Sequence, residues 1–401
     1  MEKTYYFDNA ATTFPKPECV YTKMDQINRT LAVNAGRGFY RLAKEAVHII
    51  DDLRMELLNL VNVTGAAEVV LTSSATFALN QIIGGMGFGN HPTVYVSPFE
   101  HNAVIRTLHQ TRMKYANMEV IELPTKITEL SENIKQYEID MEQVKFLFSK
   151  NPPTHIFASH VSNVIGYILP VKELFSLAKT YDAVTVLDAS QSLALVPIDF
   201  TKMNADFIVF AGHKTPYGPF GIGGFYMRKG FPLQVFLAGG TGTDSLNPEM
   251  PKTLPGKYEP ASPNILAAGG LLETLKFLKE EGKGDYQKAV SDLMDHEENI
   301  TSRMLEALHK SKDILLYLPP EKEHVGVVAL NIKNYMAADV GMILDEDYSI
   351  AVRTGYHCAP LIHKLLKDEG SAGVVRVSIS RFTTMEDVAY LVNAVGEIAE
   401  G

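Results

Sequence analysis

Cysteine is scarce in this 401-residue sequence, and its scarcity excludes several classes of protein. Only Cys19 and Cys358 occur. Two cysteines cannot build a disulfide framework or a multi-cysteine zinc or iron–sulfur site. We therefore expect a protein of a reduced compartment without a metal centre, in which each thiol has to be judged singly.

Positive charge is also in deficit. Lys and Arg number 37 against 47 Asp and Glu, which gives a net charge of -10. This is the wrong sign for tracking a phosphate backbone, so we expect no nucleic-acid partner. The first residues, MEKTYYFDNA, lack the basic stretch followed by an apolar stretch that marks a secretory signal, which favours the cytoplasm.

Long apolar runs are missing as well. The stretch Val69–Phe99 carries no charged residue, but Asn80, Gln81, several glycines and Pro92 interrupt it. No run in it approaches the roughly 18 apolar residues that a membrane-spanning helix needs. It is typical of a buried helix followed by a strand, so we expect no membrane association.

What the sequence does contain is an alternation of helix and strand patterns. Apolar residues recur at steps of three and four over Tyr40–Val61, which predicts an amphipathic helix. Farther on, helical patterns separate most of the short runs rich in β-branched residues: Glu68–Thr72, Thr93–Ser97, Met118–Leu123, His155–His160, Val184–Asp188 and Asp206–Ala211. This order predicts an α/β domain with a largely parallel sheet.

The pattern changes near Gly282–Asp285, where the chain breaks between two helical stretches. We predict a large domain over residues 15–281 and a smaller α+β domain over residues 282–401, with residues 1–14 packing against the smaller one. Strand signals in the smaller domain lie at Val325–Ile332, Ser349–Val352 and Val374–Ser378. The Gly-, Pro- and Thr-rich segment Gly239–Pro263 predicts an irregular excursion at a site or a subunit interface.

Polar residues that end apolar strands indicate where a ligand binds, because ligands of open α/β sheets lie beyond the carboxyl ends of the strands. One run ends at Asp188, a second leads to Lys214, and a third leads to His160 and Asn163. Pyridoxal 5'-phosphate needs a lysine for a Schiff base and an acid at its ring nitrogen. Lys214 and Asp188 suit these roles.

Taken singly, Lys214 is typical of a loop lysine and Asp188 of a helix N-cap. Their joint occurrence, with four glycines shortly after the lysine, favours the cofactor site. A phosphate also fits Thr72–Thr76, because backbone N–H groups at a helix start bind anions, although simple N-capping explains this segment equally well. His101 follows another strand and could stack on a ring or cap a helix.

In combination, these segments resemble class V, fold-type I pyridoxal-phosphate aminotransferases, and within them the cysteine desulfurases and selenocysteine lyases of the second type. The resemblance runs nearly end to end. It rests on these motifs: Phe7-Asp-Asn-Ala-Ala-Thr-Thr, Glu100-His-Asn-Ala, Val161-Ser-Asn, Gly212-His-Lys, Ser262-Pro-Asn and Arg353-Thr-Gly-Tyr-His-Cys-Ala-Pro. It implies a mostly parallel seven-stranded sheet in the large domain, pyridoxal 5'-phosphate as cofactor, and a homodimer.

The resemblance also implies roles for individual residues. Lys214 would form the Schiff base, His101 would stack on the ring, and Asp188 would meet the ring nitrogen. The remaining cofactor contacts would come from Ser74, Ala75, Thr76, Asn163, Gln191, His213 and, across the dimer, Ser262. Substrate contacts would come from Asn34, Arg353 and Arg376, for which a planar guanidinium suits a carboxylate. A surface arginine at a strand edge is the alternative for Arg376.

Four positions depart from the pattern of these relatives. Ala211 stands where a phosphate-binding serine is usual, Ser74 replaces a glycine, Phe77 a glutamate and Tyr356 a histidine. A lost hydroxyl contact weakens phosphate binding by on the order of 1 kcal/mol. The change at Tyr356 lies beside the cysteine and bears on the choice of substrate and sulfur acceptor.

The activity that the resemblance implies is the conversion of L-cysteine to L-alanine with a persulfide on Cys358, which an acceptor protein or thiol then takes. Neighbouring His357 and Arg353 would favour the thiolate electrostatically, on a loop that Gly370–Gly373 makes mobile. A buried structural cysteine is the alternative. L-Selenocysteine as substrate, another class V transamination or β-elimination, and a scaffold without catalysis remain open.

Overall fold

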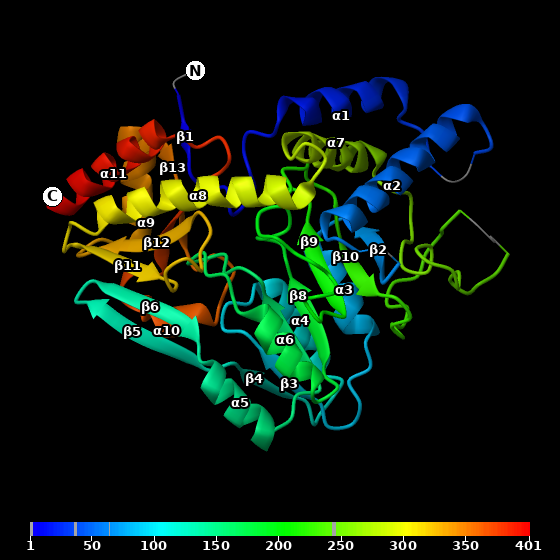
Figure 1. The fold of residues 1–401 in the computed structure, drawn as a ribbon, viewed down its shortest axis with the longest axis horizontal. Coiled ribbons are helices and arrows are strands. Elements are labelled where there is room, and N and C mark those ends of the chain that lie inside the picture. Colours follow the sequence, from blue (N-terminus) through cyan, green and yellow to red (C-terminus); the bar gives the residue numbers. More distant parts are fainter. Residues whose placement is uncertain (1–2, 36–37, 64, 243–245) are drawn as a thin grey trace.

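The computed structural model describes residues 3–35, 38–63, 65–242 and 246–401. Its central element is a seven-stranded sheet (Figure 1). In spatial order the strands are β2 (Ala67–Thr72), β10 (Gly223–Arg228), β9 (Phe207–Ala211), β8 (Val184–Asp188), β7 (His155–Ser159), β3 (Thr93–Val96) and β4 (Glu119–Glu122). Only β10 runs antiparallel to its neighbours, which confirms the predicted mostly parallel sheet.

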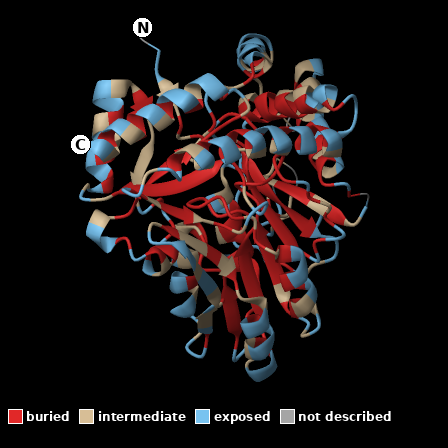
Figure 2. Ribbon diagram, turned by 60° about the vertical axis from the view of Figure 1, so that its left-hand side comes forward, coloured by how far each residue is buried: buried red, intermediate tan, exposed pale blue. Residues whose placement is uncertain are grey.

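Helices cover both faces of this sheet, so its strands are largely buried, except for the edge strand β4, whose residues are exposed or half-buried (Figure 2). Successive residues of a strand enter different cores: Ile208 packs into one apolar cluster and Val209 into the other. The helices of this part are α1 (Glu18–Thr30), α2 (Arg41–Leu60), α3 (Ala75–Gly85), α4 (Asn102–Arg112), α5 (Met141–Lys150), α6 (Val171–Lys179) and α7 (Ile265–Glu281). The stretch Val69–Phe99 is thus strand, buried helix and strand, as predicted.

A second, six-stranded sheet has the order β14 (Arg353–Gly355), β15 (Val374–Ser378), β12 (Val327–Ile332), β11 (Ile314–Leu318), β6 (Ile134–Ile139) and β5 (Thr125–Ser131). The sequence did not predict the β5–β6 hairpin or β11. Because β6 pairs with β11, this sheet includes strands from both sides of residue 282. The division of the chain into domains therefore stays a prediction.

The break near residue 282 is a helix junction, as predicted. Helix α7 ends at Glu281, and α8 (Tyr286–Leu308) begins after Asp285, whose carboxylate accepts the N–H groups of Gln287 and Lys288. Figure 1 shows α8 crossing from the first sheet to the second. The remaining elements are α9 (Ala337–Tyr348), β13 (Ile350–Ala351), α10 (Ile362–Leu366), η1 (Glu369–Ser371) and α11 (Met385–Glu400).

The N-terminal segment connects the two sheets. Strand β1 (Tyr5–Tyr6) pairs in parallel with β13, and Asp8 forms a bridge to Ser378 at the end of β15. Farther along, the hydroxyls of Thr12 and Thr13 donate to the His213 carbonyl beyond β9. Residues 5–13 therefore fix the edge of one sheet relative to the other.

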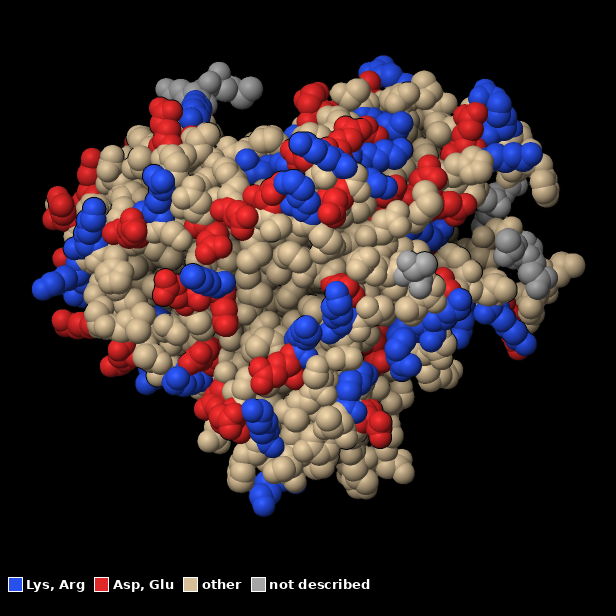
Figure 3. All heavy atoms as spheres, viewed as in Figure 1, with Lys and Arg blue, Asp and Glu red and all other residues tan. Residues whose placement is uncertain are grey.

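Charge on the face seen in Figure 3 is not gathered into a patch of one sign. On the face in Figure 3, acidic and basic side chains are interspersed. Within the part of the chain that the structure describes, no helix is both long and apolar enough to cross a bilayer.

The strands that lead to Asp188 and Lys214 are aligned by one buried acid, Asp206. Its side chain, 1% exposed, accepts from the Thr185 N–H at 2.9 Å and pairs with Lys179 at 2.5 Å and with Arg228 at 2.7 Å. These contacts join β8, β9 and β10 at their shared end. A buried carboxylate with this set of partners orients all three strands.

Replacing Asp206 with Ala should lower the free energy of unfolding by about 2 kcal/mol, because two cations and a buried N–H lose their acceptor. The urea midpoint measures the change. Asp292→Ala, which removes an exposed acid of α8, is the matched control and should shift the midpoint little. Equal midpoints for the two variants would contradict the role given to Asp206.

Candidate active site

A cavity of about 240 Å³ lies beyond the carboxyl ends of the central strands. Most residues singled out from the sequence line it: Ser74, Ala75, Thr76, His101, Asn163, Asp188, Gln191, His213, Lys214, Arg353, Cys358 and Arg376. These residues come from segments as distant as α3 and β15. Convergence of this kind is what an open α/β sheet provides at the ends of its strands.

Asp188 and Lys214 line the same cavity because β8 and β9, which lead to them, are parallel neighbours. Asp188 ends β8, and one of its carboxylate oxygens accepts the Ser190 N–H at 2.9 Å. Loss of solvation lowers the pKa of Lys214 to about 8, against the opposing effect of the Asp188 charge. A lysine of this pKa is a competent nucleophile and base near neutral pH.

The start of helix α3 forms another wall. The Ser74 hydroxyl accepts the Phe77 N–H at 3.2 Å, so Ser74 is an N-cap, the simpler of the two readings of this segment. Ala75 and Thr76 also line the cavity and begin the helix, where backbone N–H groups favour an anion. Gly223 lets β10 approach closely, because a Cβ there would lie 3.0 Å from the Ala75 nitrogen.

His101 both caps a helix and lines the cavity. Its Nδ1 accepts the Ala103 N–H at 3.0 Å at the start of α4. Burial, and next the Lys214 charge, lower the pKa of His101 to about 4, so the ring is neutral at physiological pH. A neutral ring with a fixed orientation suits stacking on a flat heterocycle.

Buried polar atoms without partners show that the cavity suits a polar ligand. Among the described side chains that line it, the Ser190 Oγ, His213 Nδ1, His357 Nδ1 and Arg376 Nε atoms are buried and have no hydrogen-bond partner. Such groups are costly unless a ligand or ordered water satisfies them. Together with Lys214 and the start of α3, they fit a phosphorylated aldehyde that has a ring nitrogen.

Two arginines lie opposite each other where β14 and β15 pair, since Arg353 is in register with Arg376. Arg376 is 1% exposed, so the alternative of a surface arginine is wrong. Its Nη2 contacts the Asp8 carboxylate at 2.5 Å, and its Nη1 donates to the Asn163 carbonyl at 3.1 Å. Both guanidinium groups line the cavity.

Cys358 is exposed and lies at the rim of the cavity, so a buried structural cysteine is excluded. The backbone is left-handed at both His357 (φ 46°) and Cys358 (φ 56°). Two contacts hold this shape: Asn163 Nδ2 donates to the His357 carbonyl at 2.8 Å, and the Asn102 N–H donates to the Cys358 carbonyl at 2.7 Å. The mobility of the loop stays a prediction; its backbone is anchored to the loop after β7 and to the start of α4.

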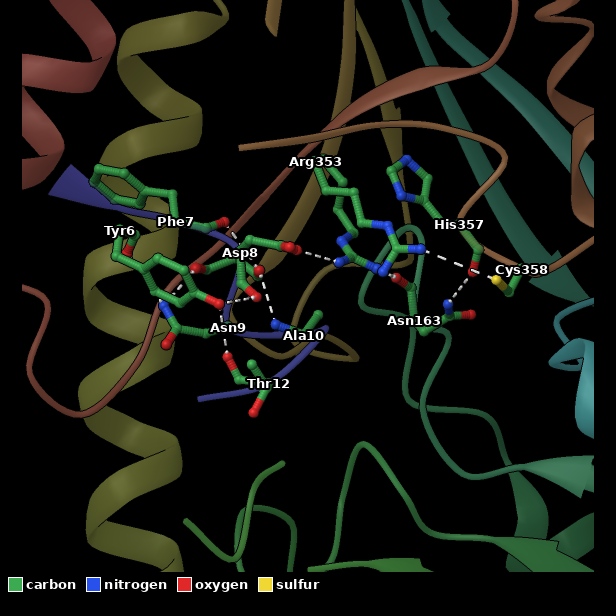
Figure 4. Close-up of polar contacts among 12 residues, drawn as sticks. Tyr6, Phe7, Asp8, Asn9, Ala10, Thr12, Asn163, Arg353, His357 and Cys358 are labelled. Carbon is green, nitrogen blue, oxygen red and sulfur yellow. Dashed lines mark hydrogen bonds and ion pairs between the residues drawn. The ribbon is translucent and has the colours of Figure 1, made fainter. Parts of the chain in front are cut away.

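His357 does not have the role that the sequence suggested. Its ring is buried, burial and then the Arg376 charge lower its pKa to about 2, and its Nε2 lies 3.0 Å from the Val374 carbonyl. A neutral imidazole cannot favour a thiolate by charge. Arg353 can, because its Nη2 lies 4.0 Å from the Cys358 sulfur (Figure 4).

Asn34 and Ser262 lie outside this cavity. They bond to each other at 3.2 Å, and both are exposed. Ser262 lines a separate, larger cavity of about 690 Å³, whose wall includes much of the irregular segment Gly239–Pro263. Within one chain, neither residue reaches the site.

Several residues of the site were not identified from the sequence. Ala10, Ala11 and Ser190 line the cavity, and Asp8 pairs with Arg376. The segment Phe7-Asp-Asn-Ala-Ala-Thr-Thr was noted only as part of a resemblance. The signal available in the sequence was the run of small and polar residues in this segment, which is typical of a turn.

Comparison with known proteins agrees with this geometry. The family described as Aminotransferase class-V matches residues 5–391. A probable cysteine desulfurase of Pyrococcus abyssi is 30% identical over 100% of this chain and 95% of its own, and a cysteine desulfurase of Pectobacterium atrosepticum is 29% identical over 96% and 91%. The solved apo cysteine desulfurase of Thermococcus onnurineus superposes with a TM-score of 0.86 at 28% identity, covering 99% of this chain and 95% of that one.

The lowered pKa of Lys214 predicts selective chemistry in cofactor-free protein. Because a lysine reacts as the neutral amine, acetylation of Lys214 by trace acetic anhydride should rise between pH 7 and 9, with a midpoint of about 8, and level off above pH 9. Exposed lysines of ordinary pKa, about 10.4, should still be rising at pH 10. Peptide mass mapping follows each site, and a Lys214 profile that matches the exposed lysines would contradict the assignment.

Proposed function

The chain belongs to the class-V aminotransferase family, and on that premise we propose that it is a cysteine desulfurase that uses pyridoxal 5'-phosphate. The observation that carries the proposal is the position of Cys358. Its thiol lines the same cavity as Lys214 and the two arginines. Transamination has no use for a thiol there, whereas removal of sulfur from an amino acid needs a nucleophile that accepts it.

The residues present would hold the cofactor at the strand ends. Lys214 would carry it, Asp188 would pair with its ring nitrogen, and the first turn of α3, with Thr76 and His213, would bind its phosphate. Ala211 supplies no hydroxyl for that phosphate. When bound, the cofactor supplies an electron sink for negative charge that develops at the substrate Cα.

The substrate carboxylate would bind Arg353 and Arg376, whose guanidinium groups both line the cavity. This places the amino acid between the arginines and Lys214. With a pKa of about 8, the Lys214 amine can take a proton from the substrate Cα and return one near neutral pH. His101 would cover the ring and exclude water from that proton transfer.

Cys358 would then accept the sulfur. Its thiolate, stabilised by Arg353, attacks the substrate sulfur, so that a sulfur–sulfur bond forms as the substrate Cβ–S bond breaks. The carbon keeps the electron pair, and a proton delivered to Cβ completes L-alanine. The sulfur remains as a persulfide on Cys358.

The acceptor would come to this persulfide from outside. Cys358, Arg353 and Asn102 also line a second, outward cavity of about 330 Å³, with the half-exposed ring of Tyr356 at its edge. Because the loop backbone is anchored on both sides of the sulfur, we propose that an acceptor protein or small thiol enters this outward cavity. We place the reaction in the cytoplasm, where such thiols are reduced.

Incubation with L-cysteine and a reductant should release sulfide and alanine in equal amounts, whereas 3-mercaptopyruvate formed without sulfide when a 2-oxo acid is added would identify a transaminase instead. Cys358→Ser should lower sulfide release at least about 100-fold, since a hydroxyl cannot take the sulfur, while the visible band of the bound cofactor persists. Cys19→Ser is the matched control and should change neither. Full sulfide release by Cys358→Ser would move the assignment to a β-lyase; selenocysteine is unsuitable as a probe because its selenium leaves more readily.

We also propose that two copies form a homodimer with the sites at their interface. Ser262, to which Asn34 donates a hydrogen bond, faces a large cavity of the same chain rather than the active site, and four exposed apolar side chains lie on nearby segments: Phe77, Val235, Phe236 and Leu237. Association would bury this surface and bring Ser262 of one copy to the phosphate of the other.

Subunit mixing tests this arrangement. Hybrids of Lys214→Ala and Ser262→Ala chains should contain one site with both defects and one with none, so mixing two impaired proteins should restore activity. Asn264 is left intact, because its side chain caps α7. A strict monomer in sedimentation, or no recovery after verified exchange, would contradict the shared site.

A further inference from the structure

The turn that carries Cys358 is tight and strained. The Ala359 N–H donates to the Tyr356 carbonyl at 3.0 Å, and φ is positive at both central residues, His357 (46°) and Cys358 (56°). This is the pattern of a type I′ turn, in which glycine, asparagine and aspartate are the usual central residues. A glycine would relieve the strain but has no thiol. The turn therefore needs contacts from outside to hold its shape.

The carbonyl groups of the turn receive these contacts. Asn163 holds the His357 carbonyl, as Figure 4 shows, and the start of α4 holds the Cys358 carbonyl. The third carbonyl, that of Tyr356, lies 3.0 Å from Nε2 of His363 on α10. His363 is 5% exposed and is not among the described residues that line the two cavities next to Cys358. It therefore contacts the turn from behind.

His363 has a second partner, Asp368. Its Nδ1 lies 2.5 Å from one oxygen of the Asp368 carboxylate, and this acid is 2% exposed. The other carboxylate oxygen is buried and has no partner among the described residues. The backbone fixes the acid in place, because the Asp368 carbonyl accepts the N–H groups of Ser371 and Gly373 directly before β15.

These two contacts determine where the protons of His363 lie. A carbonyl oxygen can only accept, so Nε2 carries a hydrogen and donates it to the Tyr356 carbonyl. Nδ1 and the Asp368 oxygen would repel each other at 2.5 Å unless a proton lay between them. The acid thus keeps the ring in the orientation that donates to the turn, as a buried aspartate does for other histidines.

We propose that His363 and Asp368 are positioning residues for sulfur transfer: together they hold the turn so that the Cys358 thiol stays at the rim of the cavity, beside Arg353. The inference rests on the proposed acceptance of sulfur by Cys358, and it adds two residues that act on this step through the backbone. Because neither side chain lines the cavity, binding of the amino acid should not depend on them.

Replacing His363 with Phe tests the inference, because the new ring is of similar size and lacks both nitrogen atoms. In the holoprotein, kcat for sulfide release from L-cysteine should fall about tenfold or more, since a misplaced nucleophile attacks much more slowly. The dissociation constant of L-alanine, a product that has no sulfur, should keep the wild-type value. General damage to the site would change both quantities.

A second readout does not depend on catalysis. Hydrogen–deuterium exchange of the peptide that spans residues 356–361, followed by mass spectrometry, reports opening of the turn. His363→Phe should make the protected amide exchange about tenfold faster, which is the effect of one lost hydrogen bond. A wild type that releases no sulfide would overturn the proposed function, whereas unchanged exchange in His363→Phe would overturn the positioning role itself.

Asp368→Asn is the conservative variant. Its amide can donate to Nδ1 and so keep the hydrogen on Nε2, which means that kcat and exchange should stay close to the wild type. Lys364→Ala, which removes an exposed side chain of the same helix, is the matched control and should change neither.

Three further results would contradict the inference: unchanged kcat in His363→Phe, a loss of L-alanine binding as large as the loss of kcat, or an Asp368→Asn protein as impaired as His363→Phe. If His363→Phe does not fold, His363→Met removes the same donor with a flexible side chain, and the same outcomes apply to it.

Discussion

The charges buried at the carboxyl ends of the central strands are the constraint on which the rest of the structure depends. Asp188 and Arg376 are almost fully buried, and Lys214 is shielded enough for its pKa to fall to about 8. Charges in such places are stable only with partners or a ligand. The fold supplies hydrogen-bond and ion-pair partners for some of these groups and leaves other buried polar atoms without a partner. A ligand of the site has to satisfy the polar atoms that are left.

The partners come from segments far apart in the chain. Asp8 belongs to the N-terminal segment, Asn163 follows β7, and Arg376 lies on β15. The Arg376 guanidinium nevertheless contacts both the Asp8 carboxylate and the Asn163 carbonyl. The site therefore exists only when the second sheet, the first sheet and the N-terminal segment are assembled. This explains why residues 5–13 are pinned to β13, to Ser378 and to the His213 carbonyl.

The sequence pattern within short segments predicted those features that depend on neighbouring residues in the chain. The buried strands were recognisable from their β-branched runs, and Asp188 and Lys214 from their positions at strand ends. The β5–β6 hairpin was missed because β5 is mostly polar and exposed, and the buried apolar residues of β6, Ile134, Tyr137 and Ile139, are separated by polar residues and do not alternate strictly.

What local pattern could not give depends on contacts between distant segments. The neutrality of His357 follows from burial beside Arg376, and the pairing of Asp8 with Arg376 follows from the placement of the N-terminal segment. Resemblance named Asn34 and Ser262, but a single chain cannot bring them to the cavity.

The most direct test of the account is the mass of the Cys358 peptide after one turnover with L-cysteine in the absence of any thiol acceptor. The account predicts that this peptide gains the mass of one sulfur atom, that the Cys19 peptide does not, and that alanine forms in an amount equal to the modified peptide. Alanine and sulfide formed in full while Cys358 stays unmodified would contradict it.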